Sequence, residues 1–233
     1  LMNQNTVKNE HYYYTKAIKL FDNNGSFEDC VELLGKAIEA NPEMIEAYIK
    51  RAYIYIWFLA EQQKALYDCD TALKLDNNCI EALCYRADIY IYHLHKYNEA
   101  INDCAQAIKL NENYIEAYSR RVDAYLELKE YKNAIYDFSK IIELAPSNNY
   151  DIIDLLEIHE QRAWCYIQLE FYDKALEDYA TMIRMDDSYV RAFIFRGLLY
   201  EKLNKADLAK KDFEELRLKS DYDIEKIHNL FII

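Results

Sequence analysis

Apolar residues recur along most of this chain at the three- and four-residue spacing of amphipathic helices. In residues 115–148 this spacing is found in two stretches, 118–125 and 134–144, separated by a short polar break. The spacing predicts two short helices joined by a turn. Only 3 Gly and 2 Pro occur among the 233 residues, which favours helices throughout the chain.

The same pair of helices recurs at a fixed period. The phrase Ile-Glu-Ala, followed by Tyr or Leu, begins at Ile45, Ile80 and Ile115, 35 residues apart. A period of this size indicates stacked helical hairpins, in which each repeat contacts only its neighbours. Six repeats can be counted, at residues 11–44, 45–79, 80–114, 115–148, 156–189 and 190–221.

Residues of matching size occupy matching positions in these repeats. Small or medium residues lie midway along each first helix at Ile18, Ala52, Ala87, Val122, Ala163 and Gly197. Others lie early in each second helix at Cys30, Ala65, Ala100, Ala134, Ala175 and Ala209. With these positions the sequence resembles the tetratricopeptide repeat family over nearly its whole length. The resemblance implies an all-α, right-handed superhelical solenoid of about six helix-turn-helix repeats.

The period lengthens once, between the fourth and fifth repeats. Equivalent alanines are 41 residues apart there, against 34 in the following repeat. The seven added residues, 149–155, carry apolar side chains at helical spacing that leads into Leu156. We therefore expect a longer first helix in the fifth repeat, capped by Ser147 or Asn148. A loop is the alternative.

The two ends of the chain differ from the repeats. Residues 1–10 form a polar lead, and residues 222–233 carry an apolar stripe typical of a helix. A solenoid needs a final helix to cover the last hairpin, so a C-terminal capping helix is predicted there, with Ser220 or Asp221 as its N-cap. Its apolar ending at Phe231 leaves self-association through this helix as an alternative.

An arginine precedes the small residue of the first helix in five repeats, and an aspartate follows the alanine of the second helix in the same five. The pairs are Arg51 with Asp68, Arg86 with Asp103, Arg121 with Asp137, Arg162 with Asp178, and Arg196 with Asp212. The first repeat lacks both residues, which indicates that the two side chains meet within a hairpin. The alternative is a row of guanidinium groups that awaits an anionic ligand.

Charge and composition exclude several kinds of partner. The formal net charge of −13 argues against nucleic acid, whose phosphates require a cationic surface. No apolar run approaches the length of a membrane span, so we expect no membrane partner. The six cysteines lack CxxC spacing, and Cys30, Cys69 and Cys104 fall in positions that the repeat reserves for small or buried side chains. Cytoplasmic residence with reduced cysteines is the expectation.

Residues for chemistry are not arranged as in an enzyme. His159 and Glu160 begin like a zinc-protease motif, but Ala163 stands where the second histidine is needed. His93 and His95 have no cysteine or third histidine nearby to complete a metal site. We therefore expect a non-enzymatic protein without catalytic residues, cofactor or metal.

The first helices carry apolar residues on two faces, which is typical of a helix with a partner. In the tetratricopeptide repeat family the second face lines a concave groove for peptides or partner helices. The resemblance assigns to this groove Tyr53, Ile56, Trp57, Tyr85, Asp88, Tyr92, Arg120, Asp123, Trp164, Ile167 and Phe195. For any single residue, packing between neighbouring hairpins is the alternative.

Members of this family that bind acidic chaperone tails use a clamp of Lys, Asn and Arg side chains. The clamp positions here are Ile49, Tyr53, Tyr85, Glu116 and Arg120, of which only Arg120 matches. Acidic residues share the face, namely Glu46, Glu81, Asp88, Glu116 and Asp123. We therefore expect a protein-interaction scaffold without the clamp, whose protein or peptide ligand is apolar with basic flanks. A structural subunit of a stable assembly and a co-chaperone are the alternatives.

Overall fold

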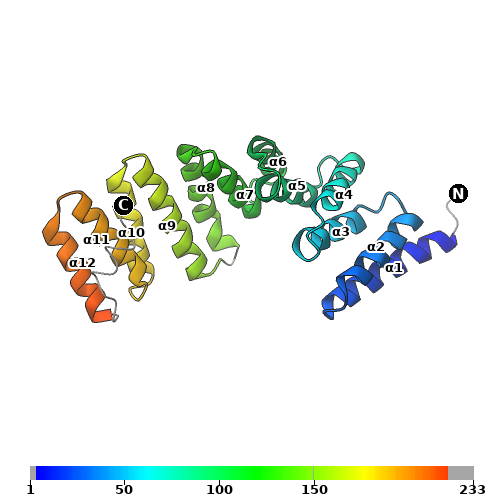
Figure 1. Ribbon diagram of the computed structural model, residues 1–233, viewed down its shortest axis with the longest axis horizontal. Helices are drawn as coiled ribbons and strands as arrows, with labels where there is room; N and C mark the ends of the chain where they lie inside the picture. The colour runs from blue at the N-terminus through cyan, green and yellow to red at the C-terminus, as the bar shows by residue number, and fades with distance from the viewer. Residues whose placement is uncertain (1–3, 149, 220–233) are drawn as a thin grey trace. The chain divides into compact units, whose positions relative to one another are not determined.

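The computed structural model describes residues 4–148 and 150–219, in which twelve α-helices and one short 3-10 helix are the regular elements. The chain divides into two compact units, residues 1–128 and 129–233, which we call the N-terminal and the C-terminal unit. Each unit is a stack of antiparallel helices (Figure 1). The all-α repeat fold predicted from the sequence is confirmed.

The N-terminal unit consists of three hairpins and one further helix. Its elements are α1 (Gln4–Asp22), α2 (Phe27–Ala40), α3 (Ile45–Trp57), α4 (Gln62–Leu75), α5 (Ile80–Tyr92), α6 (Tyr97–Leu110) and α7 (Ile115–Glu127). Helix α1 packs on α2, α3 on α4, and α5 on α6, and α7 then packs on both α5 and α6. The first helices α3, α5 and α7 also contact one another in sequence order.

The C-terminal unit follows the same plan. Its elements are α8 (Tyr131–Leu144), the 3-10 helix η1 (Ala145–Ser147), α9 (Ile152–Gln168), α10 (Tyr172–Met185), α11 (Val190–Lys202) and α12 (Ala206–Lys219). Helices α9 and α10 form one hairpin and α11 and α12 another, while α8 packs against α9. The contacts are again between neighbours, as expected for stacked repeats.

Small residues allow the paired helices to approach closely. The alanines at the predicted positions are essentially inaccessible, namely Ala52, Ala65, Ala87, Ala100, Ala134, Ala163, Ala175 and Ala209. In α11 the position belongs to Gly197, where an added Cβ would lie 2.7 Å from a ring carbon of Phe213 on α12. The absence of a side chain at Gly197 therefore sets the separation of these two helices.

The predicted register is wrong by one residue in the first repeat. Ala17 is 1% exposed and belongs to the core, whereas Ile18 is only partly buried. The reason is the length of the inner turn, the turn within a hairpin. Residues 23–26 form a turn as long as those at 58–61 and 93–96, so the 35-residue period extends back from Ala52 to Ala17.

Each inner turn contains one residue in the left-handed region, with φ between 52° and 61°. These residues are Asn24, Ala60, His95, Lys129, Glu170 and Asn204. None is glycine, although glycine adopts this conformation at the lowest cost. The tight turn that the hairpin needs therefore overrides the local preference of the residues that form it.

The outer turns, which join one hairpin to the next, are built on an Asn or Asp side chain. This side chain accepts a hydrogen bond at 2.9–3.0 Å from the backbone N–H two residues later, at Asn41, Asp76, Asn111 and Asp186. Ala145 takes this place after α8 and has no such acceptor. The chain there forms η1 and enters the insertion instead.

The insertion lengthens a helix, as expected. Helix α9 has 17 residues, against 13 in each of the first helices α3, α5, α7 and α11. The predicted caps, Ser147 and Asn148, are wrong because the helix begins only at Ile152. Its N-cap is Asp151, whose carboxylate accepts a hydrogen bond from the N–H of Asp154 at 2.8 Å.

The ends of the chain add one correction. Helix α1 begins at Gln4, so residues 4–10, which the sequence analysis assigns to a polar lead, are helical. The predicted capping helix, residues 222–233, lies outside the described residues, together with its caps Ser220 and Asp221 and its apolar ending. That helix and the self-association through it stay predictions.

Four of the five predicted arginine–aspartate pairs form inside their hairpins. Each arginine donates two parallel hydrogen bonds of 2.6–3.0 Å to its aspartate, in the pairs Arg51–Asp68, Arg86–Asp103, Arg162–Asp178 and Arg196–Asp212. The fifth pair, Arg121 with Asp137, takes one residue from each compact unit and stays a prediction. Because these four guanidinium groups are used within the fold, they do not form a row that awaits an anion.

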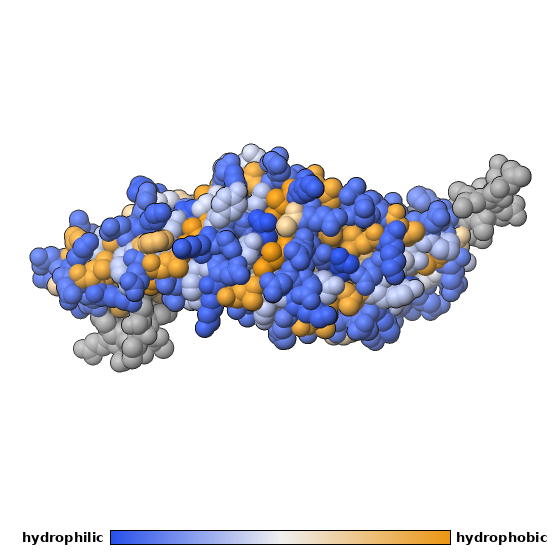
Figure 2. All heavy atoms as spheres, turned by 90° about the horizontal axis from the view of Figure 1, so that it is seen from above, coloured by the Kyte–Doolittle hydropathy of each residue, from blue (hydrophilic) through white to orange (hydrophobic). Residues whose placement is uncertain are grey.

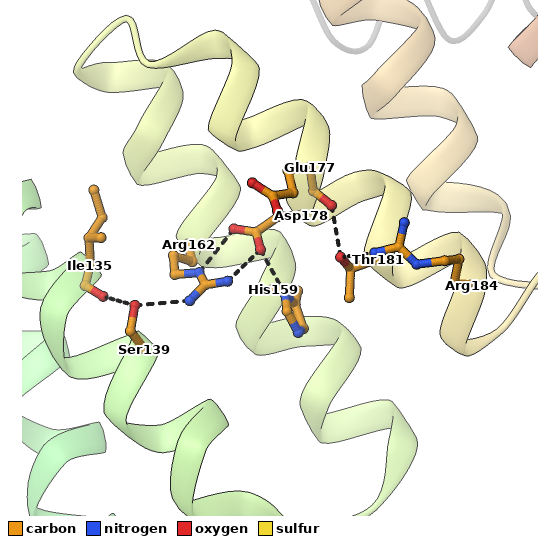
Figure 3. A network of polar contacts seen from close by, with 8 residues as sticks. All are labelled: Ile135, Ser139, His159, Arg162, Glu177, Asp178, Thr181 and Arg184. Atoms are coloured by element: carbon orange, nitrogen blue, oxygen red, sulfur yellow. Dashed lines mark hydrogen bonds and ion pairs between the residues drawn. The ribbon is translucent and has the colours of Figure 1, made fainter.

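The pair in the fifth repeat belongs to a larger network (Figure 3). Arg162 also donates to the Ser139 hydroxyl on α8 at 2.9 Å, and Ser139 donates to the Ile135 carbonyl. The buried ring of His159 lies with Nδ1 2.8 Å from an oxygen of Asp178. Burial raises the pKa of Asp178, but the hydrogen bonds from His159 and Arg162 outweigh it and leave the pKa lowered.

Candidate functional site

One face of the N-terminal unit is hollowed along its first helices. The hollow has a volume of about 660 Å³ and is bordered by α1, α3, α5 and the outer turn that precedes α5. Its apolar and aromatic lining consists of Tyr14, Ile45, Ile49, Tyr53, Cys79 and Tyr85. This is the face on which the sequence analysis placed a groove, and Tyr53 and Tyr85 belong to the predicted set.

Charged side chains line the same hollow. Glu46 and Glu81 are exposed and occupy equivalent positions in the first turns of α3 and α5, while Asp76 lies in the outer turn. The cation Lys50 places its Nζ 3.6 Å from the Phe21 ring centroid and 5.0 Å from that of Tyr53. Burial lowers the pKa of Lys50. The ammonium group of Lys50 thus makes cation–π contacts with two rings inside the fold.

An aromatic cluster supports this end of the hollow. The rings of Phe21, Phe27, Tyr53 and Phe58 come from α1, α2 and the end of α3, with centroids 4.1–6.0 Å apart. Tyr53 also contacts Tyr85 on α5, with centroids 5.9 Å apart. Packed rings of this kind hold the tyrosines in place before any ligand arrives.

A polar cluster joins α5 to α7. Arg120 donates from Nε to Asp88 Oδ1 at 2.8 Å, and Tyr92 donates its hydroxyl hydrogen to Asp123. Asp88 is only 2% exposed, and its other oxygen, Oδ2, has no hydrogen-bond partner. Burial raises the pKa of Asp88 to about 6, and the charge of Asp123 adds to this while Arg120 opposes it. Four of the predicted site residues thus form one contiguous group.

Besides Asp88, two predicted site residues are buried, and both belong to the apolar core. Ile56 and Ile167 are each 7% exposed, and they pack into the clusters around Ala65 and Ala175. For these two residues the alternative interpretation, packing between hairpins, is correct. Two other residues of the predicted set are exposed, namely Trp57 at 51% and Tyr92 at 49%.

Aromatic residues are also exposed in the C-terminal unit. Trp164 on α9 is 45% exposed and meets the Tyr131 ring edge-on, with centroids 5.3 Å apart. Phe195 is partly buried and stacks on Tyr179. On the face seen in Figure 2, apolar residues form separate patches bordered by hydrophilic side chains.

Some lining residues were not anticipated. Tyr14, Asp76 and Cys79 border the hollow of the N-terminal unit but are absent from the predicted set. Tyr14 could have been found, because it stands one 35-residue period before Ile49. A second hollow of about 420 Å³, bordered by the inner turns of the last two hairpins, includes Phe171 and contains no predicted residue.

The described residues contain few features that suggest other chemistry. No group of three or more His, Cys, Asp or Glu side chains among them is placed to hold a metal ion. All six cysteines are buried and free. In the part of the chain that the structure describes, no helix has the length and apolar character needed to cross a membrane.

Comparison with known families identifies the repeat. A tetratricopeptide repeat model matches residues 115–148 and 190–216. No curated protein matches the sequence.

Solved structures share the fold at low identity. One is YrrB, described as a TPR protein with an unusual peptide-binding site, at 22% identity and a TM-score of 0.68, covering 85% of this chain and 98% of that one. Another is MamA from Desulfovibrio magneticus RS-1, at 16% identity and a TM-score of 0.66, covering 81% and 99%. PilF of Pseudomonas aeruginosa is similar at 17% identity and a TM-score of 0.66, covering 95% and 96%.

Proposed function

Because the chain belongs to the tetratricopeptide repeat family, we propose that it is a non-enzymatic protein-interaction scaffold that binds a peptide or a partner helix through its first helices. The observation that carries this proposal is the open hollow of the N-terminal unit, which combines tyrosines with the carboxylates of Glu46, Asp76 and Glu81. Ligand sites in proteins are concave and combine apolar walls with a few polar groups that fix orientation.

The aromatic side chains supply the binding energy in this proposal. Tyr53 and Tyr85 are held by ring contacts, so little side-chain entropy is lost when a ligand packs on them. Trp57 lies one turn beyond Tyr53 and is half exposed, and Trp164 offers a similar surface in the C-terminal unit. Exposed aromatic residues of this size are typical of the residues that dominate an interface.

The ligand is not an acidic tail of the kind held by the carboxylate clamp. Ile49, Tyr53 and Tyr85 carry no cation at the clamp positions, and Glu116 reverses a required charge. The matching residue, Arg120, has its guanidinium paired with the buried Asp88. A partner with apolar side chains and basic flanks fits this face better, and its binding weakens with salt as exposed charges are screened.

Removing the two exposed tryptophans tests the function. The Trp57→Ala and Trp164→Ala double variant should lose capture of partners from native extract, measured by affinity purification and mass spectrometry. Its helicity and melting temperature should stay close to those of the parent protein, because both side chains are half exposed. Tyr67→Ala is the matched control, since Tyr67 is an exposed aromatic residue on the second helix α4.

Two results would contradict the proposal. A double variant that unfolds would mean that the tryptophans are needed for the core. A folded double variant that still captures every partner would place the binding site elsewhere on the molecule.

A further inference from the structure

Three carboxylates recur at one position on the first helices of the N-terminal unit. Glu46, Glu81 and Glu116 stand in the first turns of α3, α5 and α7, one 35-residue period apart, and all three are exposed. Among the described residues none of the three forms an ion pair. Two of them line the hollow described above.

The cations on the same helices are already engaged. Lys50 lies over the Phe21 and Tyr53 rings, and Arg120 is bound to Asp88. Neither forms an ion pair with Glu46, Glu81 or Glu116. The hollow is lined by the carboxylates of Glu46, Asp76 and Glu81 and by one cation, Lys50. A ligand approaching this face therefore meets aromatic rings and an excess of negative charge, which is complementary to a ligand with cationic side chains.

Asp88 on α5 has a buried carboxylate oxygen without a hydrogen-bond donor. Asp88 lies three residues after Tyr85 on α5, so the two share one side of the helix, and Tyr85 borders the hollow. One carboxylate oxygen of Asp88 is bound by Arg120, and the other is buried without a hydrogen-bond partner. Asp123, which accepts a hydrogen bond from Tyr92, is near enough for its charge to act on Asp88. A cationic N–H donor is the group that would satisfy it.

The geometry of the stack determines how basic residues must be spaced. Helices α3, α5 and α7 pack on one another in order, and packed helices lie about 8–10 Å apart. An extended chain in the polyproline II conformation advances about 3.1 Å per residue, so about three residues separate one first helix from the next. It has three residues per turn, so every third side chain faces the same side.

We propose that the N-terminal unit, in the function proposed above, binds an extended protein segment with a lysine or arginine at every third residue. One basic side chain of the segment lies against each of Glu46, Glu81 and Glu116. Its intervening apolar residues pack on the tyrosines of the hollow, Tyr53 and Tyr85. The charge, the buried and unsatisfied acceptor at Asp88 and the helix spacing all favour the same ligand.

Two synthetic peptides of identical composition test the spacing. One nine-residue peptide, blocked at both ends, carries lysine at every third position among leucine and serine, and the other has its three lysines adjacent. Fluorescence anisotropy on the full chain should give at least about tenfold tighter binding of the periodic peptide. A peptide with glutamate in place of each lysine should bind more weakly than either.

Charge-neutral variants of the protein assign the effect to the three carboxylates. Glu81→Gln should weaken binding of the periodic peptide about fivefold, and the triple variant with Glu46→Gln and Glu116→Gln should abolish the preference between the peptides. Glu99→Gln is the control, because Glu99 is an exposed acidic residue on the second helix α6. Melting temperatures of all variants establish that each is folded.

Equal affinity for the two lysine peptides would overturn the inference, as would a preference that survives in the folded triple variant. Tighter binding of the glutamate peptide would overturn it as well. These outcomes are separable from the scaffold function, which the tryptophan variants test. If those variants lose partner capture while the peptides are not distinguished, the scaffold stands and the basic, three-residue ligand is wrong.

Discussion

Single residues decide how closely the helices of a hairpin approach. In most repeats the position is an alanine, but in α11 it is Gly197, against which the Phe213 ring packs directly. Gly35 on α2 is different, because the nearest atom to a Cβ there is an Arg51 nitrogen at 3.6 Å, an ordinary contact distance. The two glycines therefore have opposite roles, one required by packing and one merely weakening a helix.

Alanine at these two positions should change stability in opposite directions. Gly197→Ala should lower the free energy of unfolding by about 1–3 kcal/mol, because the Phe213 ring must move. Gly35→Ala should raise it by roughly 0.5–1 kcal/mol, because alanine is the better helix former. Urea unfolding of both variants checks this, and a stabilised Gly197→Ala protein would contradict the packing argument.

Asp88 should make stability depend on pH. Its pKa is about 6 in the folded protein, above the ordinary 3.8, so the folded state retains a proton that the unfolded state has lost between these values. The free energy of unfolding therefore falls as pH rises from about 4 to about 6, by at most about 3 kcal/mol from this group.

The Asp88→Asn variant isolates this contribution. Asparagine does not titrate, so the variant should lack the part of the pH profile that Asp88 causes. Urea unfolding at pH 4, 5, 6 and 7 should show the difference in stability, wild type minus variant, decreasing across that window. Parallel profiles for the two proteins would show that Asp88 carries an ordinary pKa.

At the scale of helices, the arginine–aspartate pairs join the two arms of a hairpin. In four hairpins the arginine donates two hydrogen bonds to an aspartate 16 or 17 residues later, so the contact is local and recurs along the chain. Burial raises the pKa of Asp68 and Asp103, and the paired guanidinium groups oppose that shift. The aspartates are therefore costly to bury alone and depend on their partners.

Removing one partner should be much more damaging than removing a surface charge. Asp68→Ala should lower the free energy of unfolding by about 3 kcal/mol, because Arg51 is left partly buried without its carboxylate. Glu32→Gln, which removes an exposed ion pair with Lys36 on α2, should leave the unfolding transition nearly unchanged. Equal effects of the two substitutions in urea unfolding would contradict the structural role of the pair.

At the scale of the molecule, the buried residues described in each compact unit form several clusters, which follow one another along the chain. The six cysteines show this, because they are all buried yet lie at Cys30, Cys69, Cys79, Cys84, Cys104 and Cys165. Burial raises the pKa of their thiols, to about 12 for Cys84 and Cys165. The reactivity of each thiol therefore reports local unfolding of the repeat that contains it.

Thiol labelling should accordingly require local unfolding. Iodoacetamide in native buffer should modify all six cysteines at least about a hundredfold more slowly than in urea, because a buried neutral thiol is unreactive. Mass spectrometry of pulse-labelled protein measures both rates, and labelling of Cys104 at the unfolded rate would contradict its burial.

What the sequence determined by itself is what repeats within a short distance along the chain. The 35-residue period and the small residues predicted the hairpins, and the joint loss of arginine and aspartate in the first repeat predicted the internal pairs. These features depend on contacts within one hairpin, so one-dimensional spacing was sufficient. The error at Ile18 arose where the length of a turn had to be assumed.

Only the tertiary structure decided which side of each first helix stays open. Ile56 and Trp57 are adjacent in sequence, yet the first is in the core and the second is half exposed, and Ile167 and Trp164 differ in the same way. The boundary between them depends on how the next hairpin packs, which no local pattern specifies. The burial of Asp88 and the seating of Lys50 on aromatic rings have the same origin. Both contacts bring together side chains from different hairpins, so they exist only once the stack has formed.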